Sequence, residues 1–450
     1  MRLNSTIALA AVAAVLASPA AAEAKGHKHA RHHAAKPAAE AVEGELTAAE
    51  QLQYAQQQIS QMQAQLNDLQ AKMNAAGGTD KAMAAAQAAD AKASKALAAA
   101  DAVKASSAKT DKAMGNMQWA ANTKLSGRIY ANFSNLSVQN NGVKTPTTGT
   151  GFAIKRVYLG VDHKINDTYS LNVTTDISDV AGTTGNLVGK GLYLKKAYVQ
   201  AKLSPAFIVR VGAADMPWMP YIEGMEGHRH IENTLVDRLS FGTSADWGVH
   251  VLGDLNKYVS YQVSMINGGG YRNAKITNTV DIEGRISANY NGFFAAVGGY
   301  TGKLGQDTKG IAVTPRTSER FNAAVGFKNE TFTIGGEYFG AKNWKNLTAV
   351  DTSAVGYMLF GTYNFTPKLS VFGKYEWAAT NHQTAANPKD VYYNLGLQYK
   401  PAKNMDVALV YKRDLARGGA IGTSNGTIGA AGAASRGTYD EVGVFTQVRF

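Results

Sequence analysis

The sequence predicts an all-β protein: a 16-stranded antiparallel transmembrane β-barrel preceded by an α-helical coiled-coil arm. Three observations predict this fold class. From residue 123 onward apolar and polar side chains alternate, short turns and long loops interleave along the same region, and a helical heptad pattern precedes it. The 450 residues are rich in Gly, Tyr and Phe and contain no Cys, which excludes a disulfide framework, a thiolate zinc site and a cysteine nucleophile.

The first residues are typical of an export signal. Arg2 provides a short basic segment, residues 6–17 are apolar, and residues 18–22 form a small-residue cleavage site. We therefore expect residues 1–22 to be removed as a signal peptide. Residues 23–45 are rich in Ala, Lys and His and cannot build a core. We expect a disordered segment whose histidines are solvated rather than bound to metal.

Residues 46–114 are predicted to form a helical arm. Apolar side chains recur there at alternating spacings of three and four, which is the a/d pattern of a coiled coil and implies partner helices. Gly77-Gly78 interrupts the helix, and residues 79–114 resume as an Ala-rich helix. A single helical spacer is the alternative. The predicted coiled-coil seam consists of Leu52, Ala55, Ile59, Met62, Leu66, Leu69 and Met73.

Residues 115–450 are predicted to form the barrel. Seven short turns, among them the type I′ pair Asn291-Gly292, alternate with eight long loops, as expected for a transmembrane barrel with its turns on the periplasmic side. The final residue, Phe450, is expected to be the C-terminal barrel-assembly signal. The predicted strands are 123–138, 152–163, 168–178, 192–203, 206–213, 245–253, 257–266, 280–290, 292–301, 319–328, 331–340, 354–365, 368–378, 391–400, 404–413 and 438–450.

Each predicted strand has one apolar and one polar face. A Lys or Arg side chain on the lipid side costs about 2–4 kcal/mol at the membrane midplane, so the charged face must line the lumen. Aromatic residues beside the short turns, such as Tyr258 and Phe332, are typical of an interfacial girdle. The predicted pore-lining residues are Arg128, Arg156, Asp162, Lys196, Arg210, Asp281, Glu283, Arg285, Arg320, Lys374 and Glu376.

The strand number also predicts a function. Sixteen strands enclose an aqueous channel rather than a packed interior, so we expect passive diffusion of small hydrophilic solutes and ions. The formal net charge of +12 favours anions, although acidic side chains on the same wall weaken that preference.

The segment 214–244 is expected to fold into the barrel and narrow the pore. Pro217 and Pro220, beside aromatic residues, indicate an ordered loop, and an external loop is the alternative. Its carboxylates and histidines also suit acid–base or metal chemistry, but no nucleophile stands in a recognisable setting. We therefore expect no enzyme, metal or cofactor. The predicted constriction residues are Asp215, Trp218, Tyr221, Glu223, Glu226, His228, Arg229, Glu232, Asp237 and Arg238.

Several segments resemble a known family. Residues 152–161 (FAIKRVYLGV) and 164–171 (KINDTYSL) are similar to the early hairpin of the phosphate-selective porin O/P family of Gram-negative bacteria. Residues 196–201 (KAYVQA) and 209–212 (VRVG) are similar to the next hairpin, and Pro217 and Glu223 fall in the loop after it. The resemblance implies a sixteen-stranded trimeric porin with an inward-folded loop, in which arginine ladders and a lysine cluster bind phosphate. Arg156 and Arg210 are candidate members of such a ladder.

Location and partners follow from these expectations. The barrel should lie in the outer membrane, in contact with its lipid and lipopolysaccharide and delivered by the barrel-assembly machinery, with the arm in the periplasm. The resemblance implies a homotrimer, and no nucleic-acid partner is expected. Two other functions stay open: a structural tether that links the outer membrane to peptidoglycan through the coiled coil, and a hydrolase carried on the barrel.

Overall fold

The computed structural model describes residues 57, 60–61, 63–72, 75, 80–179, 190–344, 352–381 and 387–450. The chain divides into two compact units, Met1–Ala121 and Asn122–Phe450. The predicted signal peptide (1–22), the predicted disordered segment (23–45) and the seam residues Leu52, Ala55, Ile59, Met62 and Met73 lie outside the described residues.

The first unit contains the long helix α3 (Asp80–Ala121), which continues past the predicted end at residue 114. Its many alanines have the highest helix propensity, and Gly115 is the one glycine inside it. Half-buried positions of α3 recur at spacings of three and four and carry small side chains, for example Ala86, Ala89 and Ala93. Leu66 and Leu69 of the predicted seam are also half-buried. No helix in the described ranges is long and apolar enough to cross a membrane.

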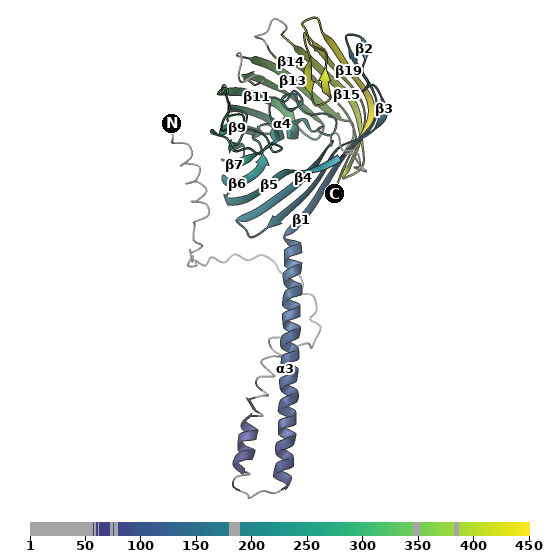
Figure 1. The fold of residues 1–450 in the computed structure, drawn as a ribbon. Helices are drawn as coiled ribbons and strands as arrows, with labels where there is room; N and C mark the ends of the chain where they lie inside the picture. Colours follow the sequence, from purple (N-terminus) through teal and green to yellow (C-terminus); the bar gives the residue numbers. More distant parts are fainter. Residues whose placement is uncertain are drawn as a thin grey trace. The chain divides into compact units, whose positions relative to one another are not determined.

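The second unit is a closed antiparallel barrel, as Figure 1 shows. It consists of sixteen long strands. The sheet is closed because β1 pairs with both β3 and β19. This confirms the predicted strand number. The strands are β1 (Thr123–Asn140), β3 (Gly149–Lys164), β4 (Tyr169–Asp179), β5 (Lys190–Ser204), β6 (Phe207–Asp215), β7 (Ala245–Asp254), β8 (Val259–Ile266), β9 (Asp281–Tyr290), β10 (Phe293–Gly302), β11 (Ser318–Lys328), β12 (Phe332–Lys342), β13 (Ser353–Asn364), β14 (Leu369–Ala379), β15 (Lys389–Ala402), β16 (Met405–Arg417) and β19 (Arg436–Arg449).

Shorter elements decorate the loops. The two-residue strand β2 (Val143–Lys144) extends the β1–β3 connection, and β17 (Ile421–Thr423) pairs with β18 (Gly426–Ile428) in a separate small sheet. The connection between β6 and β7 holds two short helices, α4 (Met219–Glu226) and α5 (Leu235–Arg238). In Figure 1 α4 lies within the ring of strands.

Three of the short turns are stabilised in the same way. In each, an Asn side-chain oxygen accepts hydrogen bonds from the backbone N–H groups two and three residues later, which is an Asx turn. Asn166, Asn256 and Asn329 each do this, with N···O distances of 2.7–3.0 Å. The Asn291-Gly292 turn instead places both residues at positive φ, 48° and 88°, as a type I′ turn requires. We call this end of the barrel the turn end and the opposite end the loop end.

The two faces of the strands follow the predicted alternation. Apolar side chains such as Val325, Leu359 and Leu395 are exposed on the outer surface, while polar side chains on the same strands are buried inside. The alternation fails at two β-bulges. Tyr130 pairs with Arg156 and Ala131 with Ile154, so Lys155 is left as an extra residue in β3. Thr174 pairs with Lys196 and Thr175 with Leu194, which leaves Lys195 extra in β5.

The bulges have a consequence for the lumen. A strand without a bulge points neighbouring side chains to opposite faces, so one residue of each basic pair would face lipid. The extra residue lets both members of Lys155-Arg156 and of Lys195-Lys196 face the interior. Ile154 and Leu194, immediately before them, stay exposed on the outer face.

Candidate functional site: a loop folded into the barrel

The β6–β7 connection, residues 216–244, fills part of the barrel interior. Its residues contact strands on opposite sides of the barrel, which is possible only if the segment folds into the interior. The backbone N–H of Trp218 donates to Glu283 of β9 at 3.0 Å, and its indole Nε1 donates to Glu337 of β12 at 2.5 Å. On the other side, Lys155 of β3 donates to the backbone oxygen of Ile231 at 2.9 Å.

An apolar cluster holds the first half of this loop. Trp218, Met219 and Ile222 are fully buried and pack in one cluster with wall residues that include Phe339 and Met358. Gly298 on β10 permits the approach, because a Cβ there would lie 2.7 Å from a ring carbon of Trp218. Aromatic burial of this size is among the largest single contributions that a side chain makes to packing.

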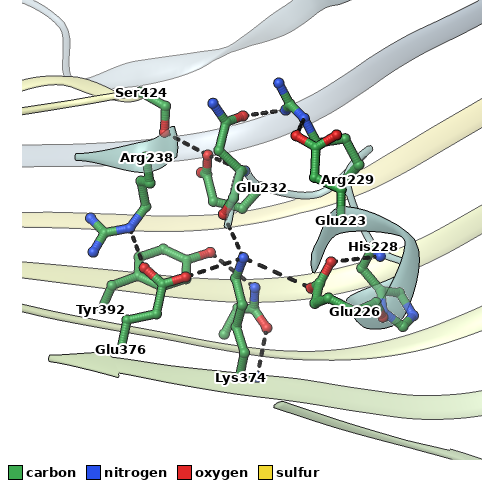
Figure 2. A network of polar contacts seen from close by, with 12 residues as sticks. Glu223, Glu226, His228, Arg229, Glu232, Arg238, Lys374, Glu376, Tyr392 and Ser424 are labelled. Carbon is green, nitrogen blue, oxygen red and sulfur yellow. Dashed lines mark hydrogen bonds and ion pairs between the residues drawn. The ribbon is translucent and has the colours of Figure 1, made fainter. Parts of the chain in front are cut away.

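A buried ion cluster holds the second half. Arg238 of α5 is 0% exposed and reaches carboxylates on three adjacent strands. Its Nε lies 2.6 Å from Glu376, its Nη1 lies 2.7 Å from Asp414, and its Nη2 pairs with Asp390. The guanidinium also lies over the ring of Tyr392, 4.6 Å from its centroid. Figure 2 shows Arg238 beside Glu376 and Tyr392.

Two buried lysines of the wall, Lys374 and Lys412, extend this cluster toward the middle of the loop, and Figure 2 shows Lys374. The Lys374 ammonium lies 3.3 Å from Glu376 and 3.8 Å from Glu226. The Lys412 ammonium lies 3.0 Å from Glu441 and 3.4 Å from Glu232 of the loop. Burial raises the pKa of Glu232, but the ammonium groups of Lys412 and Lys155 outweigh it and hold the pKa well below its ordinary value. Glu232 therefore binds Lys412 as an anion.

Arg229 organises the loop internally. Its Nε lies 2.7 Å from Glu223 and its Nη2 lies 3.3 Å from Asp237, and it also donates to Asn233. Burial lowers the pKa of Arg229, but Glu223 and Asp237 outweigh it and raise the pKa well above its ordinary value. Glu223 thus serves as a partner for a fixed cation rather than as a free acid or base.

Two histidines lie at the centre of the loop. His228 stacks on Phe372 of β14 with ring centroids 3.9 Å apart, and burial lowers its pKa. His230 is 2% exposed, and neither ring nitrogen has a hydrogen-bond partner among the residues that the structure describes. Burial, then neighbouring His228 and nearby Lys155, lowers the pKa of His230 well below its ordinary value. Both rings are therefore held in their neutral form.

Two cavities lie beside the loop. The turn-end cavity, of about 670 Å³, is lined by residues that include Arg128, Tyr158, Lys195 and Arg229. The loop-end cavity, of about 530 Å³, is lined by residues that include Arg156. Side chains of the loop line both cavities. The turn-end cavity is otherwise lined mainly by residues of β1, β3 and β5, whereas the loop-end cavity is lined by Arg156 of β3, the β8–β9 loop and residues of β7 and β9–β11. The space that the loop leaves unfilled lies along these residues.

The predicted pore-lining residues separate into three groups. Those that line a cavity are Arg128, Asp162 and Lys196 at the turn end, Arg210 in a further turn-end cavity, and Arg156, Glu283 and Arg320 at the loop end. Those covered by neighbouring groups are Asp281, Lys374 and Glu376, each 5% exposed or less. Arg285 packs against loop residue Tyr221, with its guanidinium 4.4 Å from the ring centroid.

The predicted constriction residues share one loop but differ in surroundings. Trp218, Glu226, His228, Glu232 and Arg238 are buried. Asp215 is the last residue of β6 and pairs with Lys196 at 3.0 Å. Phe450 extends the β19–β1 pairing, since its backbone exchanges two hydrogen bonds with Gly127, and its ring is 64% exposed.

Sequence reasoning did not include Lys155, Lys195 or Arg272 among the pore residues. A strict period of two assigns Lys155 and Lys195 to the lipid face. The signal was nonetheless present, because two adjacent basic residues inside a membrane strand place a charge in lipid unless a bulge intervenes. Arg272 lies in the β8–β9 loop, where no periodicity applies.

Replacing Arg238 with methionine should release the second half of the loop. Asp390 and Asp414 would lose their buried cation, and Glu376 would keep only Lys374. Breaking such a buried pair costs about 3–5 kcal/mol. Amide hydrogen exchange across residues 228–240 should accelerate in Arg238→Met, while exchange in β9 and β10 stays slow. The control is Arg417→Met, which changes an exposed arginine. Unchanged protection of the loop in Arg238→Met would contradict the assigned role.

His230 should make the loop sensitive to acid. Its pKa is lowered in the folded state, so the released loop binds more protons below about pH 6.5, and stability falls as pH drops from there. The limit is about 1.4 kcal/mol per pH unit for one group. His230→Phe should flatten this dependence in hydrogen-exchange measurements between pH 7.5 and 5. His163→Phe, outside the loop, should keep the wild-type slope; identical slopes in all three proteins would refute the assignment.

Comparison with known proteins agrees with this geometry. Residues 123–219 match the family described as phosphate-selective porin O and P. Comparison with curated proteins gave no match. Among solved structures, the chain is similar to the anion-selective porin from Comamonas acidovorans, with 14% identity, a TM-score of 0.54 and coverage of 73% of this chain and 99% of that chain. In-vitro folded OmpT of Vibrio cholerae gives 14%, 0.51, 73% and 97% on the same measures. OmpF of Salmonella typhi in complex with daunomycin gives 12%, 0.50, 73% and 97%.

At these identities the solved structures establish the fold, which is that of an outer-membrane porin. Together with the family match over residues 123–219, this fold supports a location in the outer membrane and suggests a channel rather than an enzyme. The matched segment also contains both hairpins on which the resemblance in the sequence rests, 152–171 and 196–212. Over residues 123–219 the chain is therefore similar to the phosphate-selective porin O and P family, and its barrel has the porin fold.

Proposed function

We propose that this protein is an outer-membrane porin, a water-filled channel for passive diffusion of small hydrophilic solutes and ions with a preference for anions. One observation carries the proposal. The inward loop narrows the barrel, and the interior that it leaves open presents cations that have no carboxylate partner among the described residues. Phosphate is one candidate anion, given the family.

Three cations, two on strands of the wall and one in the β8–β9 loop, contact tyrosines instead of acids. The Lys195 ammonium lies 4.5 Å from the ring centroid of Tyr158, and it donates to the Tyr158 hydroxyl at 3.3 Å. Arg272 lies 4.4 Å from the ring of Tyr193 and donates to its hydroxyl at 2.6 Å. Arg128 donates to a tyrosine hydroxyl, that of Tyr130, at 3.2 Å. None of the three cations makes an ion pair within the described ranges.

These contacts form a continuous row. The ring of Tyr271 lies 5.8 Å from Arg272 and 6.0 Å from Lys195, and the rings of Tyr158 and Tyr130 meet edge to face at 5.8 Å. The row therefore leads from the loop-end cavity to the turn-end cavity. A tyrosine stabilises a cation by about 0.5–2 kcal/mol without cancelling its charge. An anion that passes through meets three uncompensated charges, which raises its local concentration.

The remaining expectations complete the proposal. Residues 1–22 act as a signal peptide, residues 23–45 are a disordered tail, and residues 46–114 associate three copies through a coiled coil in the periplasm. The barrel turns face the same compartment. Phe450 serves as the assembly signal for the barrel-assembly machinery, and the outer face contacts lipid and lipopolysaccharide. Strand ends near the short turns support this orientation, because Tyr258, Phe293, Phe332 and Phe365 are exposed there as an aromatic girdle.

Planar-bilayer recordings test the proposal. The purified protein should form open channels, and the reversal potential in a salt gradient should show anion preference. Lys195→Gln should lower the anion-to-cation permeability ratio by about fivefold, since a unit charge at about 4 Å contributes about 1 kcal/mol in water. Lys309→Gln, an exposed loop lysine, should leave the ratio unchanged. Correctly folded protein that forms no channels would rule out the porin, and a hydrolase would then be sought through turnover of ester and glycoside substrates.

Deleting residues 23–114 separates the porin from the tether. A porin whose arm assembles trimers should keep its single-channel conductance, because the conducting wall lies wholly in the second unit. The variant should lose trimer stability on unheated gels rather than conductance. Loss of co-sedimentation with peptidoglycan, with conductance and oligomeric state unchanged, would instead support the tether.

A further inference from the structure

The loop-end cavity has two chemically different sides. Its lining includes Arg156 and Arg272 with Tyr271, and it also includes Tyr300, Leu304 and Trp344. Arg320 stands beside the latter group, with its guanidinium 5.7 Å from the ring centroid of Tyr300 and 5.2 Å from that of Trp344, and it is paired with Glu283. Its volume of about 530 Å³ lies within the range of sites that enclose small organic ligands. Conduction of an inorganic anion accounts for the presence of Arg156 and Arg272 in this lining. It does not account for the apolar and aromatic residues Tyr300, Leu304 and Trp344.

The cationic side has donors to spare. Arg272 is exposed, and its partners within the described ranges are the ring and hydroxyl of Tyr193 and the ring of Tyr271. Arg156 uses Nη1 for both Asp176, at 2.9 Å, and Tyr193, at 3.1 Å. Its Nη2 makes no hydrogen bond in this part of the structure. Both guanidinium groups donate to the hydroxyl of Tyr193, so they lie close together, and guanidinium N–H groups are good donors to a carboxylate.

The apolar side is built rather than incidental. Trp344 meets Tyr300 edge to face with ring centroids 4.9 Å apart, and its indole Nε1 donates to the backbone oxygen of Ser240 at 3.1 Å. Both rings pack with Leu304 in one cluster that includes Met216 and Ile266. Trp344 stays half-buried and lines the cavity, so it presents an aromatic surface to whatever enters.

The acids that border the cavity are already bonded. Glu283 lies 2.8 Å from Arg320 and accepts from the backbone of Trp218. Asp246 accepts from the backbone N–H groups of Trp247 and Gly270, at 2.7 and 3.0 Å. Asp237 pairs with Arg229. Arg156 and Arg272 are therefore the groups with free capacity, and that capacity is for an anion.

We propose that the loop-end cavity is a binding site for small aromatic carboxylates. The carboxylate binds Arg272 and Arg156, and the ring packs against Trp344 and Leu304. The site lies at the loop end of the passage, so it rests on the proposed porin function and names a solute class for it. An inorganic anion satisfies the cationic side only.

Calorimetric titration of the full-length protein in detergent tests this site with benzoate, acetate and inorganic phosphate as probes. Benzoate should bind about tenfold more tightly than acetate, because it also buries an apolar ring. Trp344→Ala should remove this advantage while acetate binding stays as it was. Arg272→Gln should weaken both carboxylates, and Arg417→Gln, an exposed arginine outside the cavity, should weaken neither.

Two further variants keep the test decisive. Trp344→Phe retains a ring and should retain most of the benzoate preference, and Leu304→Ala should reduce that preference if Trp344→Ala fails to fold. Equal affinity of the wild-type protein for benzoate and acetate would overturn the proposal, as would a benzoate preference that survives Trp344→Ala. The calorimetric measurement does not depend on ion conduction. A protein that binds benzoate but forms no channels would therefore contradict the porin function and still support this binding site.

Discussion

The interior of the barrel depends on the ion pairs between Arg238 and three carboxylates of the wall. Taking one charge out of water costs several kcal/mol even after relaxation, so a charged loop stays inside a barrel only where each charge meets a partner. Glu376, Asp390 and Asp414 stand on β14, β15 and β16, and one guanidinium bonds all three. These ion pairs fix the position of the loop. They also require that β14, β15 and β16 pair in the register that brings the three carboxylates together.

The ion pairs between the loop and one part of the wall determine which part of the wall can attract anions. Lys374 and Lys412 are cancelled by loop carboxylates, so they add nothing to the field in the passage, although both point inward. The field comes instead from the β3–β5 wall, where Lys195 has no carboxylate partner among the described residues. The formal charge of +12 is thus a poor guide to selectivity. The position of a few uncompensated cations matters more.

Periodicity and turn chemistry predicted the barrel from the sequence, because lipid imposes a period of two on every strand and closure leaves no edge. The same rule failed at Lys155 and Lys195, where an extra residue reverses the phase, and a bulge is decided by pairing with the neighbouring strand. The partners of the buried charges could not be predicted from the sequence either. Arg238 lies more than a hundred residues from each of its carboxylates, and nothing local in the sequence connects them.

Tyrosine is the partner that makes an uncompensated cation tolerable in this wall. A carboxylate would hold Lys195 in place but cancel its charge, and water alone would leave the long side chain free to move. The ring and hydroxyl of Tyr158 hold the ammonium and leave its charge intact. Rings that stabilise cations also give a polar lumen aromatic surface. A passage built from such pairs therefore distinguishes solutes by their apolar part as well as by their charge, which an acid-paired wall of equal width cannot do.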